Sequence, residues 1–316
     1  MFAGMSLSLF ATPTVTDVIA KQRYPWNGLV DITCKVTGIS GTDQWKFSVA
    51  AVMPDTGDVR RSAQFWVMQN GAKSTDREVH ANGSYRLLWD AQADLGQVNY
   101  DNMVVRVTCV DVHGKVQLWE GGPYWATTNI GAENPEEFGY YFWWGDTIGY
   151  KRVNNAWVAS DGSSSNFSFD RSPTYDKSIA TLKSEGWITA NSVLAPAHDA
   201  AHVHWGGNWR MPTRQELADL NSKCDWMWAT NNNVTGYVVR GKGDYASSSI
   251  FLPCAGYGDG TSLSNAGSDG YYWLSVPYSG DSLAWSLYFD SSSHDTGSSR
   301  RRSYGRSVRP VQGFTE

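Results

Sequence analysis

The last third of the sequence lacks four polar residue types. Residues 266–310 contain no Asn, Lys, Gln or Glu, although Asn is frequent just before this tract. Ser, Gly, Asp, Tyr, Arg, His and Thr take their place, and each can be reached from an Asn codon by changing adenines only. Apolar residues still recur through the tract, for example at Trp273, Leu287 and Phe289. Fixed apolar positions among altered polar ones predict a binding surface that has been varied on a constant scaffold.

Charge and long apolar runs are also scarce. Charged residues make up 18% of the chain, below the roughly 25% of ordinary globular domains. The net charge of -5 argues against nucleic acid as a partner, because nucleic-acid-binding domains are usually basic. No apolar run approaches the roughly 20 residues that cross a bilayer, so we expect no membrane span. Residues 1–11 are uncharged and moderately apolar, and we expect them to be the remnant of a secretory signal.

Cysteine is limited to four residues, which fit either redox compartment. Cys34, Trp45 and Cys109 follow the Cys…Trp…Cys spacing of immunoglobulin domains, in which the Trp packs on a disulfide between sheets. A buried pair of unlinked thiols is the alternative. Cys224 and Cys254 leave the same choice between a disulfide and simple space filling.

Aromatic residues and one arginine cluster are plentiful against this background. Aromatics reach 14% of the chain, with 16 Trp and 16 Tyr. This exceeds what a single core needs, so some should face a ligand or partner. The local positive cluster consists of Arg300, Arg301, Arg302, Arg306 and Arg309. It is either a solvated loop or a set of ligand contacts, and the sequence leaves both open.

The region from residue 12 to residue 119 shows short strands separated by turns. Five segments alternate or run apolar, with turn-forming clusters between them. These segments are residues 28–39, 45–53, 62–69, 85–91 and 103–113. Evenly spaced strands without helical periodicity predict an antiparallel β-sandwich. Together with the cysteine spacing, they lead us to expect an all-β, immunoglobulin-like domain over residues 12–119.

The region from residue 120 to residue 316 is rich in Trp, Gly and Ser and has few predicted helices. One amphipathic helix is expected over residues 172–186. A second follows Thr213, which with Glu216 forms a capping box ahead of the apolar residues Leu217 and Leu220. Four short strands are expected, at residues 249–257, 271–277, 283–289 and 307–311. The composition predicts an α+β domain with much irregular backbone.

Five motifs follow one another in this second region. They are WATTNIGAENPEEFGYYFWWGD, WGGNWRMPTRQEL, SIFLPCAGY, GYYWLS and GRSVRPV. Their order resembles the bacterial "major paralogous domain" family, which shares the formylglycine-generating-enzyme type of C-type lectin fold. In that family the last third commonly carries many Asn residues, which this chain lacks. The departure is similar to the variable proteins of diversity-generating retroelements, whose C-type lectin folds display a hypervariable patch, here expected at about residues 256–309.

The predicted strand LAWSLYF assigns the patch to one face. Alternation along it puts Leu287 and Phe289 into the core. It puts Ser286, Tyr288 and Asp290 on the exposed face. Changes on the exposed face cost within about 0.5 kcal/mol, whereas cavities at the apolar positions cost on the order of 2–5 kcal/mol. The expected ligand contacts are Tyr271, Tyr278, Asp281, Ser286, Tyr288, Asp290, Asp295, Arg300, Arg302 and Tyr304, with Trp285 ranked below them because it also suits the core.

Three histidines are the strongest candidates for metal chemistry. On a helix His198 and His202 would share a face, and His204 could add a third nitrogen ligand for zinc or iron. Surface histidines on a short helix packed against Trp205 fit the following turn sequence better. We therefore expect neither a metal nor a cofactor.

Other enzyme motifs are weak or missing. Formylglycine-generating enzymes use a reactive cysteine pair late in the chain, but here no cysteine follows Cys254, and a thiol buried in an apolar strand is inert. Residues 133–136 superficially resemble the Glu-Pro-Asn loop of calcium-dependent lectins but better fit a helix start with Pro135 in the first turn. No phosphate loop, nucleophile elbow or zinc-protease motif occurs. We expect no catalytic residues.

Taken together, the patterns predict a non-enzymatic display protein. A β-sandwich would carry a C-type-lectin domain whose hypervariable face binds a protein or glycan on another surface. We expect an extracellular or cell-surface location, with a phage virion as the alternative. Two other functions stay open: a carbohydrate-binding module of fixed specificity that stacks exposed Trp on sugar rings, and an enzyme of the formylglycine-generating or metal-dependent type.

Overall fold

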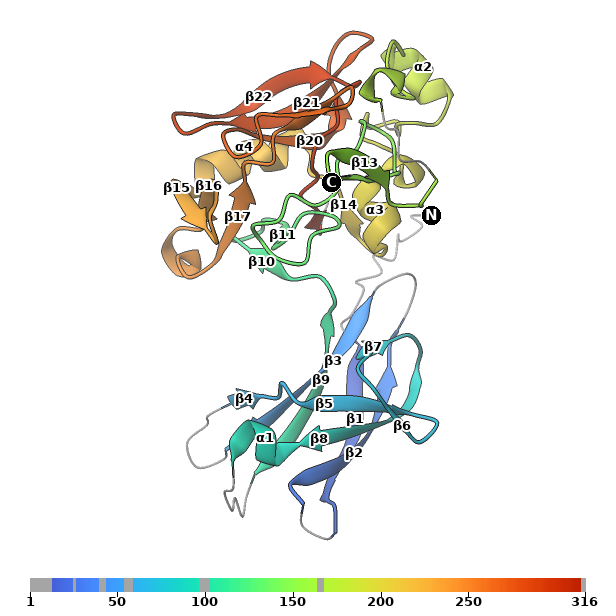
Figure 1. The fold of residues 1–316 in the computed structure, drawn as a ribbon, viewed down its shortest axis with the longest axis vertical. Coiled ribbons are helices and arrows are strands. Elements are labelled where there is room, and N and C mark those ends of the chain that lie inside the picture. The colour runs from blue at the N-terminus through green and yellow to red at the C-terminus, as the bar shows by residue number, and fades with distance from the viewer. Residues whose placement is uncertain are drawn as a thin grey trace, which may run out of the picture. The chain divides into compact units, whose positions relative to one another are not determined.

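The computed structural model describes residues 13–24, 27–39, 44–53, 59–96, 103–163 and 168–313. It is mostly β-structure, with 45% strand and 13% helix, arranged in several antiparallel sheets (Figure 1). The chain divides into two compact units between Val112 and His113. The expected signal remnant at residues 1–11 lies outside the described residues.

The first unit consists of two antiparallel sheets. Its elements are β1 (Thr14–Gln22), β2 (Leu29–Thr37), β3 (Trp45–Val52), β4 (Val59–Arg61), β5 (Phe65–Gln69), β6 (Ala72–Ser74), β7 (Glu78–Val79), β8 (Gly83–Asp90), α1 (Ala91–Leu95) and β9 (Val104–Asp111). One sheet has the order β1-β2-β8-β5-β6, and in the other β3 pairs with β4, β7 and β9. All five segments predicted as strands in this region are confirmed, as β2, β3, β5, β8 and β9.

Strict alternation builds the core of this unit. Along β2, Ile32 and Val36 are fully buried while Lys35 between them is exposed. Val49 of one sheet and Leu87 of the other are fully buried in the same cluster. Because strand side chains alternate between faces, the sequence pattern alone sends one set inward.

The two cysteines of the first unit are buried in this core as free thiols. Burial raises the pKa of both Cys34 and Cys109 to about 11. Of the two alternatives, the structure therefore has the unlinked pair.

The second unit contains several small sheets joined by long irregular segments. Its strands are β10 (Lys115–Gln117), β11 (Tyr124–Ala126), β12 (Tyr150–Val153), β13 (Ala156–Ala159), β14 (Trp209–Arg210), β15 (Asp225–Asn231), β16 (Val234–Arg240), β17 (Ser249–Pro253), β18 (Tyr257–Asp259), β19 (Ser262–Ser264), β20 (Gly270–Pro277), β21 (Leu283–Phe289), β22 (His294–Arg301) and β23 (Val311–Gln312). Its helices are α2 (Ile179–Ser184), α3 (Ala200–Trp205) and α4 (Arg214–Lys223), with 3-10 turns η1 (Phe169–Arg171), η2 (Pro196–His198) and η3 (Gly243–Tyr245).

The strands of this unit pair in five groups. The sheets have the orders β10-β11-β23-β14, β12-β13, β15-β16-β17, β18-β19 and β20-β21-β22. The sequence pattern placed the boundary between the two units after residue 119. Because β10 pairs with β11 of the second unit, the boundary lies earlier, between Val112 and His113. The strand expected at residues 307–311 is reduced to β23, which starts at Val311.

The two predicted helices differ in outcome. The capping box is confirmed: the Thr213 hydroxyl accepts the backbone N–H of Glu216, the Glu216 carboxylate accepts that of Thr213, and α4 begins at Arg214. Leu217 and Leu220 are buried as predicted. The helix expected over residues 172–186 is shortened to α2, because Ser178 acts as its N-cap and the residues before it form turns.

Side-chain donors fix the irregular backbone of the second unit. The indole N–H of Trp144 donates to the carbonyl of Leu274 at 2.8 Å, and that of Trp273 donates to the carbonyl of Phe142 at 2.9 Å. Arg309, 2% exposed, donates to the Asn129 side chain and to the carbonyls of Ala126 and Phe251, at 2.8, 3.1 and 2.9 Å. Leu274, Ala126 and Phe251 belong to the strands β20, β11 and β17, so these side chains tie short strands to the irregular segments between them.

Candidate functional site

The sheet β20-β21-β22 carries the tract without Asn, and its two faces meet different surroundings. One face packs against α4, as Figure 1 shows, through a core that contains Leu217 and Leu220 together with Leu287 and Phe289. Leu287 and Phe289 are 2% and 0% exposed, so their predicted inward orientation is confirmed. This face holds the strand in place.

The opposite face of β21 is only partly open, which corrects one prediction. Ser286 is fully buried, and Tyr271 of β20, which pairs with Tyr288 of β21, is 7% exposed. The chain returns along the outer edge of β20, where the backbone N–H of Trp273 donates to the carbonyl of Ser307. From there the Arg306 side chain reaches across the face and donates through Nη1 to the Ser286 hydroxyl at 3.1 Å. A polar residue on the expected outer face is therefore covered by a segment far along the chain, which alternation alone cannot predict.

Arg302 is the second correction. It was expected to contact a ligand, but it is fully buried. Its guanidinium donates to the backbone carbonyls of Leu283 and Lys177 at 2.9 and 2.8 Å, and also to that of Thr174. It fastens the loop before β21 to the segment before α2, so neither reading of the arginine cluster, solvated loop or ligand contact, describes it. Burial lowers the pKa of Arg302 to about 10.

Tyrosines and arginines gather on this partly open face, with Tyr271 and Arg306 buried and the others half-buried at the surface. The members of this group, called the tyrosine–arginine site below, are Tyr257, Tyr271, Tyr288, Tyr304, Arg300 and Arg306. The ring centroids of Tyr271 and Tyr288 lie 5.1 Å apart, as expected for paired residues of β20 and β21. Tyr257 joins them, with its ring 5.0 Å from Tyr271 and 5.2 Å from Tyr304.

Arg300 and Arg306 lie on the tyrosine rings in different ways. The half-buried Arg300 of β22 has its guanidinium carbon 5.4 Å from the Tyr288 ring and 6.0 Å from the Tyr271 ring. Arg306 is 1% exposed, with its guanidinium carbon 4.7 Å from the Tyr271 ring and 4.6 Å from the Trp273 ring. Desolvation lowers the pKa of Arg306 to about 9. Both contacts have the geometry of cation–π interactions.

Two carboxylates border the site and already have partners. The Asp290 carboxylate accepts the Tyr288 hydroxyl at 2.7 Å, which raises the pKa of Tyr288. Bonds from Ser292 and Tyr288 hold the pKa of Asp290 below its usual range. Asp269 accepts the Tyr271 hydroxyl at 3.2 Å. These acids orient the tyrosines.

The remaining candidates lie elsewhere. Tyr278 packs against Trp285 at 4.7 Å, and the guanidinium of Arg214 lies 3.9 Å from the Trp285 ring, so Trp285 is half-buried on the face that α4 covers. Asp281 is exposed in the loop before β21. Asp295 is exposed at the start of β22 and accepts the backbone N–H of Gly297 at 2.7 Å, a local turn contact.

A glycine pair supports the tyrosine–arginine site from below. Gly258 and Gly305 exchange backbone hydrogen bonds at 2.8 and 2.9 Å. The ring of Phe169, fully buried, lies against both, and a Cβ on either glycine would collide with it. Tyr257 and Tyr304 each adjoin one of these glycines, so the close backbone contact fixes their positions.

The three histidines considered for metal binding point to different partners. His204 bonds through Nε2 to the carbonyl of Thr147 at 2.8 Å, and the His198 ring lies 4.0 Å from the Trp187 ring. His198 ends η2, and α3 starts after it at the N-cap Asp199. His198 and His202 therefore do not share one helix, which the metal alternative would require.

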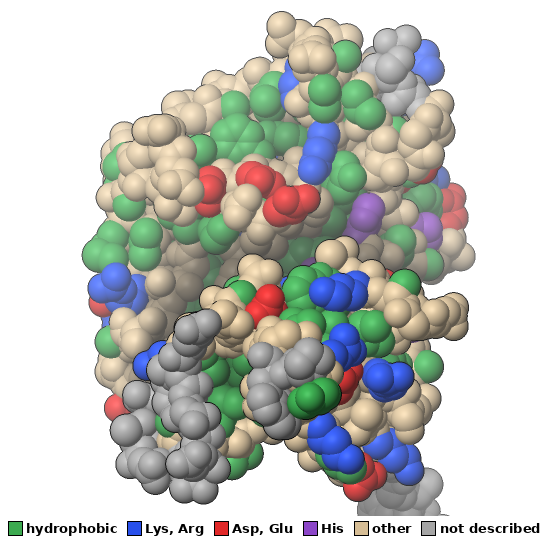
Figure 2. Space-filling model, turned by 60° about the horizontal axis from the view of Figure 1, so that its bottom comes forward, with side chains coloured by type: hydrophobic (Ala, Val, Ile, Leu, Met, Phe, Trp, Pro, Cys, Tyr) green, Lys and Arg blue, Asp and Glu red, His purple; other side chains and the backbone are tan. Residues whose placement is uncertain are grey.

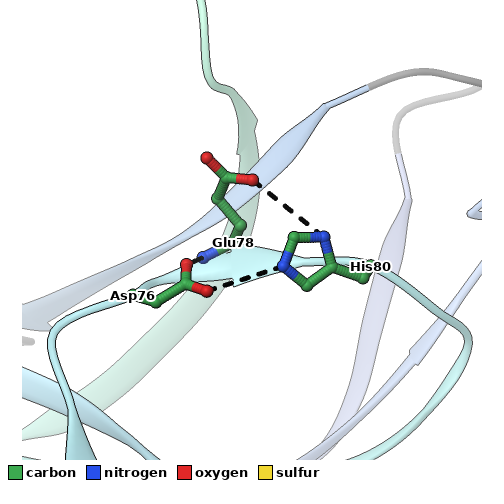
Figure 3. Close-up of side chains that lie close together, drawn as sticks. All are labelled: Asp76, Glu78 and His80. Carbon is green, nitrogen blue, oxygen red and sulfur yellow. Dashed lines mark hydrogen bonds and ion pairs between the residues drawn. The ribbon is translucent and has the colours of Figure 1, made fainter.

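Another group of metal-ligand types lies in the first unit. Among the residues that the structure describes, Asp76, Glu78 and His80 alone bring three such atoms within 4.8 Å of one another (Figure 3). The His80 ring faces both carboxylates, with Nε2 3.6 Å from Asp76 and Nδ1 4.0 Å from Glu78 (Figure 3). All three are exposed, and exposed ion pairs of this kind contribute little to stability.

The cysteines of the second unit are poorly suited to redox chemistry. Cys224 and Cys254 are buried free thiols, 4% and 0% exposed. Burial raises the pKa of each to about 11. Thiols with such a pKa stay protonated near neutral pH and are weak nucleophiles.

The visible surface carries both signs of charge. In Figure 2, acidic and basic side chains are interspersed among hydrophobic ones over the face shown. Each helix in the described part of the chain is too short or too polar to cross a membrane.

Sequence reasoning missed two parts of this site. Tyr257 precedes the tract without Asn, and only the turn to Gly258 and Gly305 brings it to Tyr304. Arg306 was noted only as one of a charge cluster. Its place under the rings has no local sequence signal, because it depends on the return of the chain along the edge of β20.

Comparisons with known proteins reach only part of the chain. No curated protein and no solved structure matches it. The comparisons lend no support to a C-type lectin or retroelement family. Residues 215–311 are similar to a family described as "Domain of unknown function (DUF8237)", and this stretch contains the sheets β15-β16-β17 and β20-β21-β22 with all ten predicted contact residues.

Proposed function

We propose that this chain is a non-enzymatic binding and display protein whose C-terminal surface has been diversified by a retroelement. In this proposal the first unit is an immunoglobulin-like spacer and the second a C-type-lectin domain of the formylglycine-generating-enzyme type. The ligand is a protein or glycan on another surface. The protein would act outside the cell or on its surface, or alternatively on a phage virion.

One observation carries the proposal: the tyrosine–arginine site lies on one face of a sheet whose other face packs into the hydrophobic core. Phe289 is fully buried while its neighbour Tyr288 is half-buried on the open face. Tyrosine provides rigid amphipathic area, and the surrounding Ser, Gly and Asp adapt hydrogen bonds, as in antibody loops. Such a surface can change its contacts without loss of the fold.

The composition of the tract supports the same proposal. Three tyrosines of the site and both its arginines fall within residues 266–310, where Asn, Lys, Gln and Glu are missing. All are residues that an Asn codon yields when adenines change. Ser286 and Arg302 are buried, so they drop out of the surface positions that can vary. The surface that can vary is therefore smaller than the composition of the tract suggests.

The test is a comparison of the gene with any nearby near-copy of its 3′ end. We expect differences only at adenines of the near-copy, within the bases that encode residues 256–309. The bases for residues 215–255 belong to the same matched region and serve as the control, and they should be identical. Differences spread over all four bases, or equally frequent in the control segment, would contradict diversification.

A second candidate, a carbohydrate-binding module of fixed specificity, is favoured by one observation. On β15, Met227 and Trp228 are 41% and 36% exposed, and the Trp228 ring packs edge-on against Tyr237 at 5.1 Å. An exposed indole held in this way is suited to stack on a sugar ring. A glycan array tests this: binding to a neutral glycan that Trp228→Ala abolishes and Met227→Ala preserves would favour it.

A further inference from the structure

Three arginines near the C-terminus are buried, but only two of them have a full set of acceptors. Arg302 and Arg309 donate to several backbone carbonyls each. Arg306 donates through Nη1 to the Ser286 hydroxyl at 3.1 Å, and its Nε has no hydrogen-bond partner. A buried polar atom without a partner costs free energy, so this arrangement calls for an explanation.

Positive charge at this place is not neutralised by the protein. Among the described residues, no carboxylate lies within 4.0 Å of a nitrogen of Arg300 or Arg306. Arg300 itself adds to the cost, because its charge repels that of Arg306. Asp269 and Asp290 stand at the border, where each accepts a tyrosine hydroxyl.

The tyrosine rings leave their edges, not their faces, for a ligand. The planes of Tyr257 and Tyr271 are inclined by 72°, those of Tyr257 and Tyr304 by 50°, and those of Tyr271 and Tyr288 by 45°. Their faces are further occupied by Arg300 and Arg306. This is a poor platform for stacking a sugar ring. The half-buried Tyr257, Tyr304 and Arg300 instead offer two hydroxyls and a guanidinium to a small charged group.

We propose that the tyrosine–arginine site binds a carboxylate side chain of an acidic protein partner, with Arg300 as the direct contact and Arg306 as the buried charge beneath. This rests on the proposed function and names its ligand class. Tyr and Arg are the residues that most often dominate protein–protein interfaces, and an Arg guanidinium pairs well with a carboxylate. Arg306 then acts as a positioning residue through its field and its contact with Tyr271.

The probes are a hexaglutamate peptide and a hexaglutamine peptide of the same length, titrated into the full chain by calorimetry. We expect hexaglutamate to bind at least about tenfold more tightly than hexaglutamine. An oligomer of uronic acid forms a third arm and offers carboxylates on sugars. Tighter binding of this oligomer than of hexaglutamate would overturn the assignment to a protein partner.

Neighbouring arginines of β22 give a matched pair of variants. Arg300 lies on the tyrosine face, opposite Ala284, while the exposed Arg301 pairs with Leu283 on the other face. We expect Arg300→Gln to weaken hexaglutamate binding about tenfold and Arg301→Gln to change it less than about twofold. An equal loss in both variants would mean diffuse attraction and would overturn the site.

A milder variant guards against loss of folding. Tyr304→Phe removes only a hydroxyl at the rim and should weaken hexaglutamate binding by about threefold, with unchanged circular dichroism. Equal binding of both peptides would overturn this ligand class while leaving diversification intact. Differences between the gene and its near-copy that are spread over all four bases would overturn diversification while leaving the carboxylate site intact.

Discussion

In the first unit the buried side chains are mostly aliphatic and come from strands that alternate in sequence, as along β2 and β8. In the second unit the sheets are small and the connections long, and indoles, hydroxyls and guanidinium groups donate to buried backbone carbonyls. The difference shows two ways to satisfy a buried backbone. Regular sheets need only apolar filling, whereas loops in a core require polar side chains at defined positions.

The largest expected effect comes from removing one of these guanidinium groups. Arg309→Met keeps the volume but leaves the carbonyls of Ala126 and Phe251 and the side chain of Asn129 without this donor. We expect the second unit to lose about 3–5 kcal/mol of unfolding free energy, since each buried unsatisfied group costs roughly 1–3 kcal/mol. Differential scanning calorimetry should show the loss in this unit alone.

The control for this variant is Arg301→Met, at an exposed arginine of the same unit. It should change stability by no more than about 0.5 kcal/mol. A similar loss in both variants would mean that guanidinium bonds to carbonyls do not distinguish the second unit.

A pH dependence of intermediate size should also separate the units. Asp199 caps α3 by accepting the backbone N–H of Ala201, and accepts that of Met211 next to β14, both at 2.9 Å. Burial raises the pKa of this carboxyl to about 6, above the ordinary value near 3.8. The folded form therefore holds the proton between these values, and stability falls as pH rises from about 4 to about 6.

Asp199→Asn removes this titration. Relative to the variant, the wild type should lose on the order of 1–3 kcal/mol of unfolding free energy across that window, measured by urea unfolding at several pH values. Parallel pH profiles of the two proteins would show that the carboxyl does not titrate in this range.

The smallest effect is expected in the first unit. The indole N–H of Trp89 donates to Asp94 at 2.8 Å, but Asp94 also accepts the Ser62 hydroxyl at 2.6 Å and two backbone N–H groups. Trp89→Phe should therefore lower the unfolding free energy by only about 1 kcal/mol through the lost hydrogen bond, with a further small loss from the smaller buried ring. Urea unfolding followed by circular dichroism measures this, and a loss as large as that of Arg309→Met would erase the contrast between the units.

The success of the predictions from sequence also differs between the regular first unit and the irregular second unit. The strands of the first unit and the capping box before α4 were found because each has a short-range cause: alternation, or a side chain bonded three residues away. Strand β22 was missed because its sequence, HDTGSSRR, has no apolar alternation; pairing with β21 alone makes it a strand.

The site was predicted only in part, for a related reason. Tyr271, Tyr288, Arg300 and Tyr304 were named and do gather in one place. The burial of Ser286 was not foreseen, because it depends on a side chain twenty residues later: Arg306 reaches across the sheet and donates through Nη1 to Ser286 Oγ. Long-range packing of this kind leaves no periodic trace.

The contact between Gly305 and the Phe169 ring has a consequence for the number of useful sequences. Gly305 lies inside residues 266–310, yet any side chain there would strike the ring. If the gene varies this tract, every change of the Gly305 codon to another residue yields a chain that folds poorly. The same holds for Ser286 beneath Arg306. The number of different binding surfaces is the product of the residue choices at each freely variable position of the open face. A position that the fold fixes contributes no choice, so it does not add to this number.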